Sequence, residues 1–133
     1  MKILTTLMLV ALLTGCATQH PPQRFAWVTG LKPDKAAYYE QLHAHPWPGV
    51  NRMIKRCHIR NYSIYEREID GKLYLFSYLE YTGQNFDADM KKMAADPETQ
   101  RWWKQTDPCQ LPLPEAAAAG KIWADAKEVY HLQ

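Results

Sequence analysis

Residues 59–81 have the sequence IRNYSIYEREIDGKLYLFSYLEY, and this stretch decides the fold. The residues from Ile59 to Glu66 follow the period of two that is typical of a strand, and the segment from Leu73 to Tyr81 repeats this period. Asp70-Gly71 lies between the two segments and is a favoured two-residue hairpin turn. The sequence therefore predicts two neighbouring antiparallel strands.

The segment before this hairpin predicts one strand and two helices. Residues 25–31 alternate as a strand does, and Pro33-Asp34 then opens a helix that runs to about Ala44. A second helix follows Trp47-Pro48, and its apolar stripe is expected in the core: Val50, Met53, Ile54 and Cys57.

The segment after the hairpin predicts two more helices and a last strand. The third helix begins near Asn85, and we expect its buried residues to be Phe86, Met90, Met93 and Ala94. Asp96-Pro97 ends it and opens a short fourth helix, and residues 128–132 form the final strand. The order β-α-α-β-β-α-α-β predicts an α+β fold with a ferredoxin-like sheet and helices on one face.

The second face of that sheet is also apolar. Tyr74, Phe76 and Tyr78 lie on one side of the third strand, and leucines occupy the other side. A second copy of the same sheet would cover the free face and give a two-fold homodimer. The alternative is a monomer with one solvent-exposed aromatic face.

The N-terminal residues predict export and a lipid anchor. Lys2 precedes an uncharged run that is too short to span a bilayer, so residues 1–15 are predicted to be a signal peptide. The run ends in Leu13-Thr14-Gly15-Cys16, which resembles the bacterial lipobox, in which the Cys is acylated. Residues 16–23 are then a lipidated tether and 24–133 the domain. The residue after Cys16 favours the periplasmic face of the outer membrane; the alternative is an ordinary cleaved signal.

Composition limits the remaining functions. The chain has 133 residues, of which 47% are hydrophobic, so it can form one domain with one modest core. Sixteen Lys and Arg against fourteen Asp and Glu leave no basic field for nucleic acid. Five Trp and eight Tyr against three Phe favour rings with a polar group, which suit pockets and interfaces. Cys57 and Cys109 are expected to be separate thiols, with a disulfide as the alternative.

Two pairs of residues are candidates for a site. Tyr39 and His43 are four apart on the first helix and share a face, so His43 could act as an acid–base group beside a tyrosine. The alternative is a surface histidine with a packing tyrosine. Trp102 and Trp103 are adjacent, about 100° apart on a helix, so one packs and the other borders a pocket, or both flank a groove. Tyr62 is a third such ring.

The chain lacks the spacings of metal and nucleotide sites. It contains no H-E-x-x-H or C-x-x-C spacing, no glycine-rich phosphate loop and no G-x-S-x-G motif. We therefore expect no metal and no cofactor.

Taken together, the motifs resemble those of the L-rhamnose mutarotases over nearly the whole mature domain. The matching segments are Pro33-Asp34, Tyr39-x-x-x-His43, Trp47-Pro48, Asn61-Tyr62-Ser63-Ile64-Tyr65, Gln100-Arg101-Trp102-Trp103-Lys104 and Glu128-Val129-Tyr130-His131-Leu132. The chain departs from the family at Ala44-His45-Pro46, where members have Asn-Pro, so one contact at the pocket edge is expected to differ. Typical members also lack a lipobox.

The resemblance implies a dimeric ferredoxin-like α/β barrel and an isomerase without a cofactor. It implies that His43 is the proton donor, that Tyr39 and Tyr62 bind a monosaccharide, and that Trp102 and Trp103 form the platform for its ring. The expected reaction is interconversion of the α and β anomers of L-rhamnose or a related 6-deoxy sugar. The alternatives are a non-catalytic carbohydrate-binding or structural lipoprotein, and an α/β-barrel monooxygenase or haem-handling protein.

Overall fold

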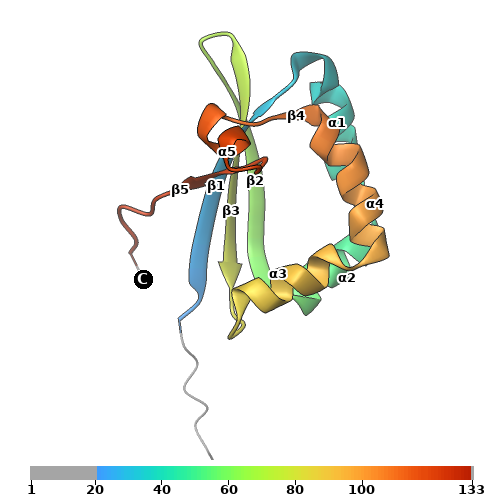
Figure 1. Cartoon of the computed structure of the whole chain (residues 1–133), viewed down its shortest axis with the longest axis vertical. Helices are drawn as coiled ribbons and strands as arrows, with labels where there is room; N and C mark the ends of the chain where they lie inside the picture. Colours follow the sequence, from blue (N-terminus) through green and yellow to red (C-terminus); the bar gives the residue numbers. More distant parts are fainter. Residues whose placement is uncertain (1–20, 133) are drawn as a thin grey trace, which may run out of the picture.

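The computed structural model describes residues 21–132, which form one curled antiparallel sheet faced by helices (Figure 1). The predicted signal peptide and Cys16 lie outside the described residues. The elements in chain order are β1 Gln23–Leu31, η1 Pro33–Lys35, α1 Ala36–Ala44, α2 Pro48–Arg56, β2 Ile59–Ile69, β3 Lys72–Tyr81, α3 Phe86–Ala94, α4 Pro97–Thr106, η2 Asp107–Cys109, β4 Gln110–Leu111, α5 Pro114–Ala118 and β5 Ala124–Ala126.

The predicted hairpin is confirmed and forms one side of the sheet. β2 and β3 pair from Ile69 opposite Lys72 onward, and Asp70 and Gly71 both have positive φ, at 49° and 71°, as a tight hairpin turn requires. The sheet order is β2-β3-β1-β4, and β5 also pairs with β1. Helices α1 to α4 lie on one side of this sheet (Figure 1), so the α+β, ferredoxin-like expectation is confirmed.

The predicted last strand is wrong. β5 is Ala124–Ala126, which pairs with Ala26–Val28 of β1, and residues 127–132 form no strand. The indole N–H of Trp27 donates to Asp125 Oδ1 at 2.9 Å and fixes this register. The apolar side chains of this segment are not buried, since Val129, Tyr130 and Leu132 are 89%, 77% and 76% exposed. Only Glu128 of this segment is tied to the sheet, through an ion pair with Arg24 at 2.7 Å.

Two hydrophobic clusters hold the helices against the two ends of the sheet. The Met53 cluster consists of Met53, Cys57, Ile59, Leu79, Tyr81 and Met93. The Leu31 cluster consists of Leu31, Tyr39, Leu75 and Cys109. The stripe predicted for α2 is confirmed, with Ile54 half-buried against the Met53 cluster. On α3 the prediction is wrong for Ala94, which is exposed because it follows Met93 by about 100° and faces solvent.

The two cysteines are separate buried thiols, as expected. Cys57 lies directly after α2, in the Met53 cluster, and donates to the Asp89 carbonyl oxygen at 3.3 Å. Cys109 belongs to the Leu31 cluster and donates to the Gln105 carbonyl oxygen, also at 3.3 Å. Both are free.

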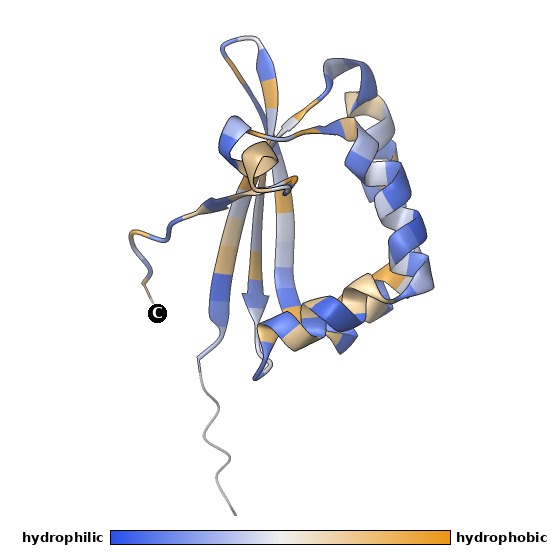
Figure 2. Cartoon of the chain, viewed as in Figure 1, coloured by the Kyte–Doolittle hydropathy of each residue, from blue (hydrophilic) through white to orange (hydrophobic). Residues whose placement is uncertain are grey.

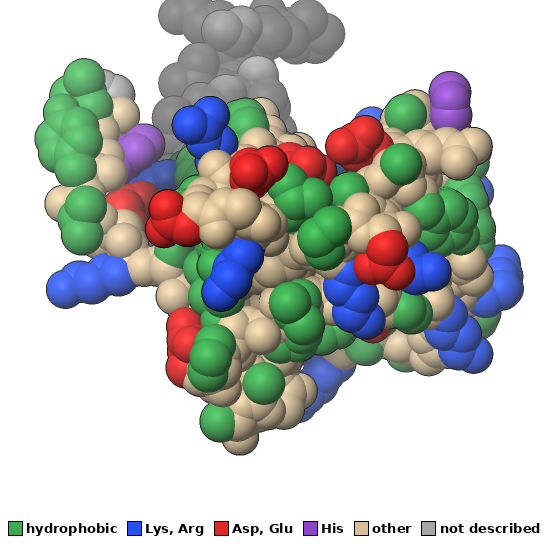
Figure 3. Space-filling model, turned by 90° about the horizontal axis from the view of Figure 1, so that it is seen from above, with side chains coloured by type: hydrophobic (Ala, Val, Ile, Leu, Met, Phe, Trp, Pro, Cys, Tyr) green, Lys and Arg blue, Asp and Glu red, His purple; other side chains and the backbone are tan. Residues whose placement is uncertain are grey.

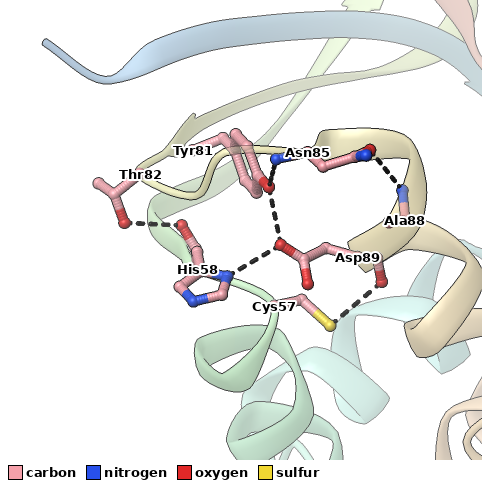
Figure 4. A network of polar contacts seen from close by, with 7 residues as sticks. All are labelled: Cys57, His58, Tyr81, Thr82, Asn85, Ala88 and Asp89. Atoms are coloured by element: carbon pink, nitrogen blue, oxygen red, sulfur yellow. Dashed lines mark hydrogen bonds and ion pairs between the residues drawn. The ribbon is translucent and has the colours of Figure 1, made fainter. Parts of the chain in front are cut away.

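A buried tyrosine closes the corner between β3 and α3 (Figure 4). The hydroxyl of Tyr81, which is 1% exposed, donates to Asp89 Oδ2 at 2.7 Å and accepts from the Asn85 N–H at 2.9 Å. His58 Nδ1 meets the same carboxylate oxygen at 2.9 Å. Hydrogen bonds from Tyr81 and His58 lower the pKa of Asp89 below its usual 3.8. Asn85 in turn caps α3 by accepting from the Ala88 N–H.

Tyr81→Phe tests this corner. The substitution keeps the ring, which packs edge-on against Phe86, but leaves the Asn85 N–H and Asp89 without their buried partner. We expect the free energy of unfolding, measured by urea denaturation, to fall by about 1–3 kcal/mol. Tyr130→Phe is the matched control, because Tyr130 is 77% exposed, and it should not change stability. Equal stability of Tyr81→Phe and wild type would contradict the assignment.

Candidate active site

A cavity of about 1270 Å³ lies between the inner face of the sheet and the helices. All five residues predicted to contact a sugar line it: Tyr39, His43, Tyr62, Trp102 and Trp103. They come from α1, β2 and α4, so the fold brings together side chains that lie far apart in the sequence (Figure 1). The structure thus places in one cavity all five residues that were predicted to contact a sugar.

The pair on α1 makes direct contact. The rings of Tyr39 and His43 have centroids 4.1 Å apart, and His43 Nδ1 lies 2.9 Å from the Tyr39 carbonyl oxygen. Because a carbonyl oxygen only accepts, Nδ1 carries the hydrogen and Nε2 keeps its lone pair when the ring is neutral. Burial lowers the pKa of His43 below 6.5, against the opposing effect of this hydrogen bond. His43 is therefore neutral at neutral pH, with Nε2 as a proton acceptor.

The tandem tryptophans occupy two parts of the cavity wall. Trp102 is 6% exposed and meets the His43 ring edge-on, with centroids 5.2 Å apart. Trp47 packs edge-on behind Trp102 at 5.4 Å and holds it in place. Trp103 is half-buried and packs against the Met53 cluster. The sequence left two arrangements open: one indole packed and the other at a pocket, or both beside a groove. In the structure both indoles line the same cavity.

Hydrogen bonds at the start of α4 hold the helix whose two indoles line the cavity. Most of this helix is hydrophilic (Figure 2), and the two tryptophans are the only aromatic side chains in its sequence, PETQRWWKQT. Asp96 caps its first turn by accepting from the Thr99 N–H at 2.8 Å. Glu98 accepts from the Gly49 N–H at 3.2 Å and links α4 to α2.

Tyr62 enters the cavity through an irregularity in β2. The register shifts between Arg60 and Ser63, and Asn61 has a φ of 48°, as in a β-bulge. Tyr62 is 43% exposed to the open cavity, and desolvation of its phenol raises its pKa above 10. Burial also raises the pKa of Tyr39 well above 10. Both phenols stay protonated at neutral pH and can donate hydrogen bonds.

Sequence reasoning missed several polar groups in the cavity, among them Ser77 and Asp107. Ser77 is buried on the inner face of β3 and lines the cavity between Leu75 and Leu79. The sequence does mark Ser77, because this polar residue interrupts an otherwise apolar face of β3. Asp107 of η2 also lines the cavity, and burial raises the pKa of its carboxyl above 3.8. Nothing in its local sequence marks it.

The departure at residues 44–46 lies at the rim. Pro46 lines the cavity, whereas His45 is exposed, does not line it, and ends α1 through a bond from its N–H to the Leu42 carbonyl oxygen. Pro46 keeps the proline of the family's Asn-Pro, so the side chain that departs from the family is His45, which does not line the cavity.

Other kinds of site find no support in the part of the chain that the structure describes. Within residues 21–132, no group of three His, Cys, Asp or Glu side chains could hold a metal ion. Over the same range, no helix is long and apolar enough to cross a membrane. The face drawn in Figure 3 carries acidic and basic side chains mixed together, unlike the uniform basic surface of a nucleic-acid binder.

The fold and the cavity define a class of protein. It is an α+β protein with a curled antiparallel sheet, and the cavity between sheet and helices is lined by a histidine, two tyrosines and two tryptophans. A family model described as L-rhamnose mutarotase matches residues 24–132. The chain belongs to the L-rhamnose mutarotase family.

Individual relatives agree with the family match. The L-rhamnose mutarotase of Bacillus subtilis is 31% identical over 110 residues, covering 83% of this chain and 98% of the relative. That of Opitutus terrae is 30% identical over 109 residues, covering 82% and 97%. A crystal structure of an L-rhamnose mutarotase from Formosa agariphila superposes with a TM-score of 0.62 at 20% identity, over 84% of this chain and 99% of that one. The structural match concerns the fold alone.

Proposed function

We propose that the protein interconverts the α and β anomers of L-rhamnose by opening and closing the pyranose ring. Family membership supports this proposal, and one geometric observation carries it: His43 Nδ1 is held by the Tyr39 carbonyl oxygen, which leaves Nε2 free beside Trp102 in the cavity. Mutarotation needs only proton transfers, so one histidine and neighbouring hydroxyls suffice.

The reaction follows from the protonation states of the cavity. Neutral His43 takes the proton of the anomeric hydroxyl at Nε2, the bond between the anomeric carbon and the ring oxygen breaks, and the ring oxygen takes a proton from a tyrosine hydroxyl or water. The aldehyde group then rotates about the bond to the neighbouring carbon, so that its other face is presented to the ring oxygen. Closure reverses each transfer, and protonated His43 returns its proton to the new anomeric hydroxyl. His43 is thus the base first and the proton donor afterwards, while Tyr39 and Tyr62 hold hydroxyls and Trp102 and Trp103 pack against the ring.

Exchange between the two anomeric proton signals of L-rhamnose, measured by NMR, tests the proposal. The wild type should accelerate exchange, and His43→Ala should reduce the acceleration about 10²- to 10⁴-fold, as for loss of one acid–base group. His45→Ala is the matched control, because His45 is exposed and does not line the cavity. Sugar-dependent tryptophan fluorescence without exchange would favour the alternative, a binding protein without catalysis.

The pH dependence of that exchange gives a second readout. Since His43 acts first as a base and its pKa lies below 6.5, the rate should be constant above pH 6.5 and fall as the pH drops through the His43 pKa. An acid limb centred above pH 6.5, or one that persists in His43→Ala, would contradict this role.

We further infer that a second copy covers the outer face of the sheet. Tyr65 and Phe76 lie opposite one another on β2 and β3, and they are 63% and 38% exposed. Tyr74 and Tyr78 extend this aromatic face along β3. The face lies away from α1 to α4, so a two-fold partner leaves the cavity's helical wall intact.

Size-exclusion chromatography with light scattering tests the homodimer. The wild type should have twice the mass of one chain, and Phe76→Glu should be a monomer, because a buried unpaired charge would oppose association. Tyr38→Glu is the control on α1, and it should stay dimeric. A monomeric wild type would support the alternative of a single sheet with one exposed aromatic face.

We propose also that the protein is exported and anchored by a lipid on Cys16, at the periplasmic face of the outer membrane. In bacterial cells, radioactive palmitate should label the wild type in the outer-membrane fraction. Cys16→Ser should remove the label, and Cys109→Ala should keep it. A labelled Cys16→Ser variant, or an unlabelled wild type, would contradict the anchor.

A further inference from the structure

The cavity is larger than one sugar ring requires. At about 1270 Å³ it exceeds the roughly 300–1,000 Å³ of pockets that enclose drug-sized ligands, and a monosaccharide is smaller than such a ligand. The residues assigned to L-rhamnose occupy only part of its lining. The remainder has its own side chains and its own chemistry.

This remainder is an aromatic wall on β1 and α3, which we call the β1 wall: Phe25, Trp27 and Phe86. The rings of Phe25 and Trp27 are parallel to within 4° with centroids 5.6 Å apart, and Phe86 stacks on Phe25 at 4.1 Å. All three are half-buried and line the cavity.

The β1 wall is separate from the assigned site but continuous with it. The sheet order places β3 between β2, which carries Tyr62, and β1. Two strand spacings put roughly 10 Å between the backbones of β2 and β1. Trp103, which follows Trp102 in α4, lines the same cavity and packs against the Met53 cluster, as the three rings of the β1 wall do.

Charged groups stand beside the β1 wall. Asp125 accepts from the Trp27 indole at Oδ1, and Lys121 donates to its Oδ2 at 3.4 Å. Asp87, at the start of α3, also lines the cavity. Aromatic faces with a few polar groups beside them can pack a ring and orient its hydroxyls. Carboxylates here also disfavour a large apolar planar ligand, which would desolvate them.

We propose that the β1 wall is a second sugar subsite, and that the substrates include oligosaccharides with L-rhamnose at the reducing end. This inference rests on the proposed function. Only the anomeric carbon, its hydroxyl and the ring oxygen change in mutarotation, so a glycosidic bond to another hydroxyl of L-rhamnose is neither made nor broken. The attached sugar lies against the β1 wall while the reducing ring lies at His43.

NMR exchange at the reducing-end anomeric protons tests the inference, with free L-rhamnose and three disaccharides in which glucose is joined to O2, O3 or O4 of L-rhamnose. For at least one disaccharide, the wild type should give a kcat/KM within about tenfold of that for free L-rhamnose. Exchange of free L-rhamnose but of no disaccharide would overturn the subsite and leave the proposed function intact. No exchange of free L-rhamnose would overturn both.

Variants of the β1 wall separate the two parts of the cavity. Asp125→Ala and Trp27→Leu both remove the hydrogen bond that fixes β5 on β1, so kcat/KM for free L-rhamnose also reports whether the cavity stays intact. Each should lower kcat/KM for the disaccharide about tenfold or more, and change that for free L-rhamnose by less than about twofold. Asp34→Ala, an exposed acid on η1 away from the cavity, is the control and should change neither. Equal losses for both substrates would overturn the subsite.

Discussion

The antiparallel pairing of β3 with both β1 and β2 is the constraint on which the rest of the structure depends. It joins three strands into one inner face, with β3 at the middle. Leu75 and Leu79 belong to different hydrophobic clusters at the two ends of that face, and Ser77 lies between them. The helices therefore pack at the ends of the sheet, and the middle, where β3 presents a hydroxyl, borders the cavity.

The chemistry of the cavity depends on how α1 positions His43. α1 contributes Tyr39 to the Leu31 cluster, which turns His43, one helical turn later, toward the cavity. The same turn supplies the carbonyl oxygen that fixes the tautomer of His43. Burial then keeps the ring neutral. One interaction within a helix thus positions the histidine, selects its free nitrogen and leaves that nitrogen unprotonated.

Local patterns predicted the parts of this structure that local interactions determine. The hairpin followed from alternation and Asp70-Gly71, and the contact of Tyr39 with His43 followed from a spacing of four. β5 could not be predicted, because three residues have no period and their place depends on the distant Trp27. Residues 128–132 contain three large apolar side chains, as a strand often does, but these side chains are exposed. That both Trp102 and Trp103 reach one cavity depends on the orientation of α4, which its contacts with α2 determine.

The size of the cavity affects how strongly the polar groups of the protein interact with the reacting atoms of the sugar. A lone monosaccharide at His43 leaves the volume beside Phe25 and Trp27 to water, and water weakens electrostatic interactions at the reacting atoms. An occupant of the β1 wall displaces that water and lies against Trp103, the ring next to Trp102. A longer substrate therefore fills the volume that a single sugar leaves open, and it keeps solvent away from Nε2 of His43.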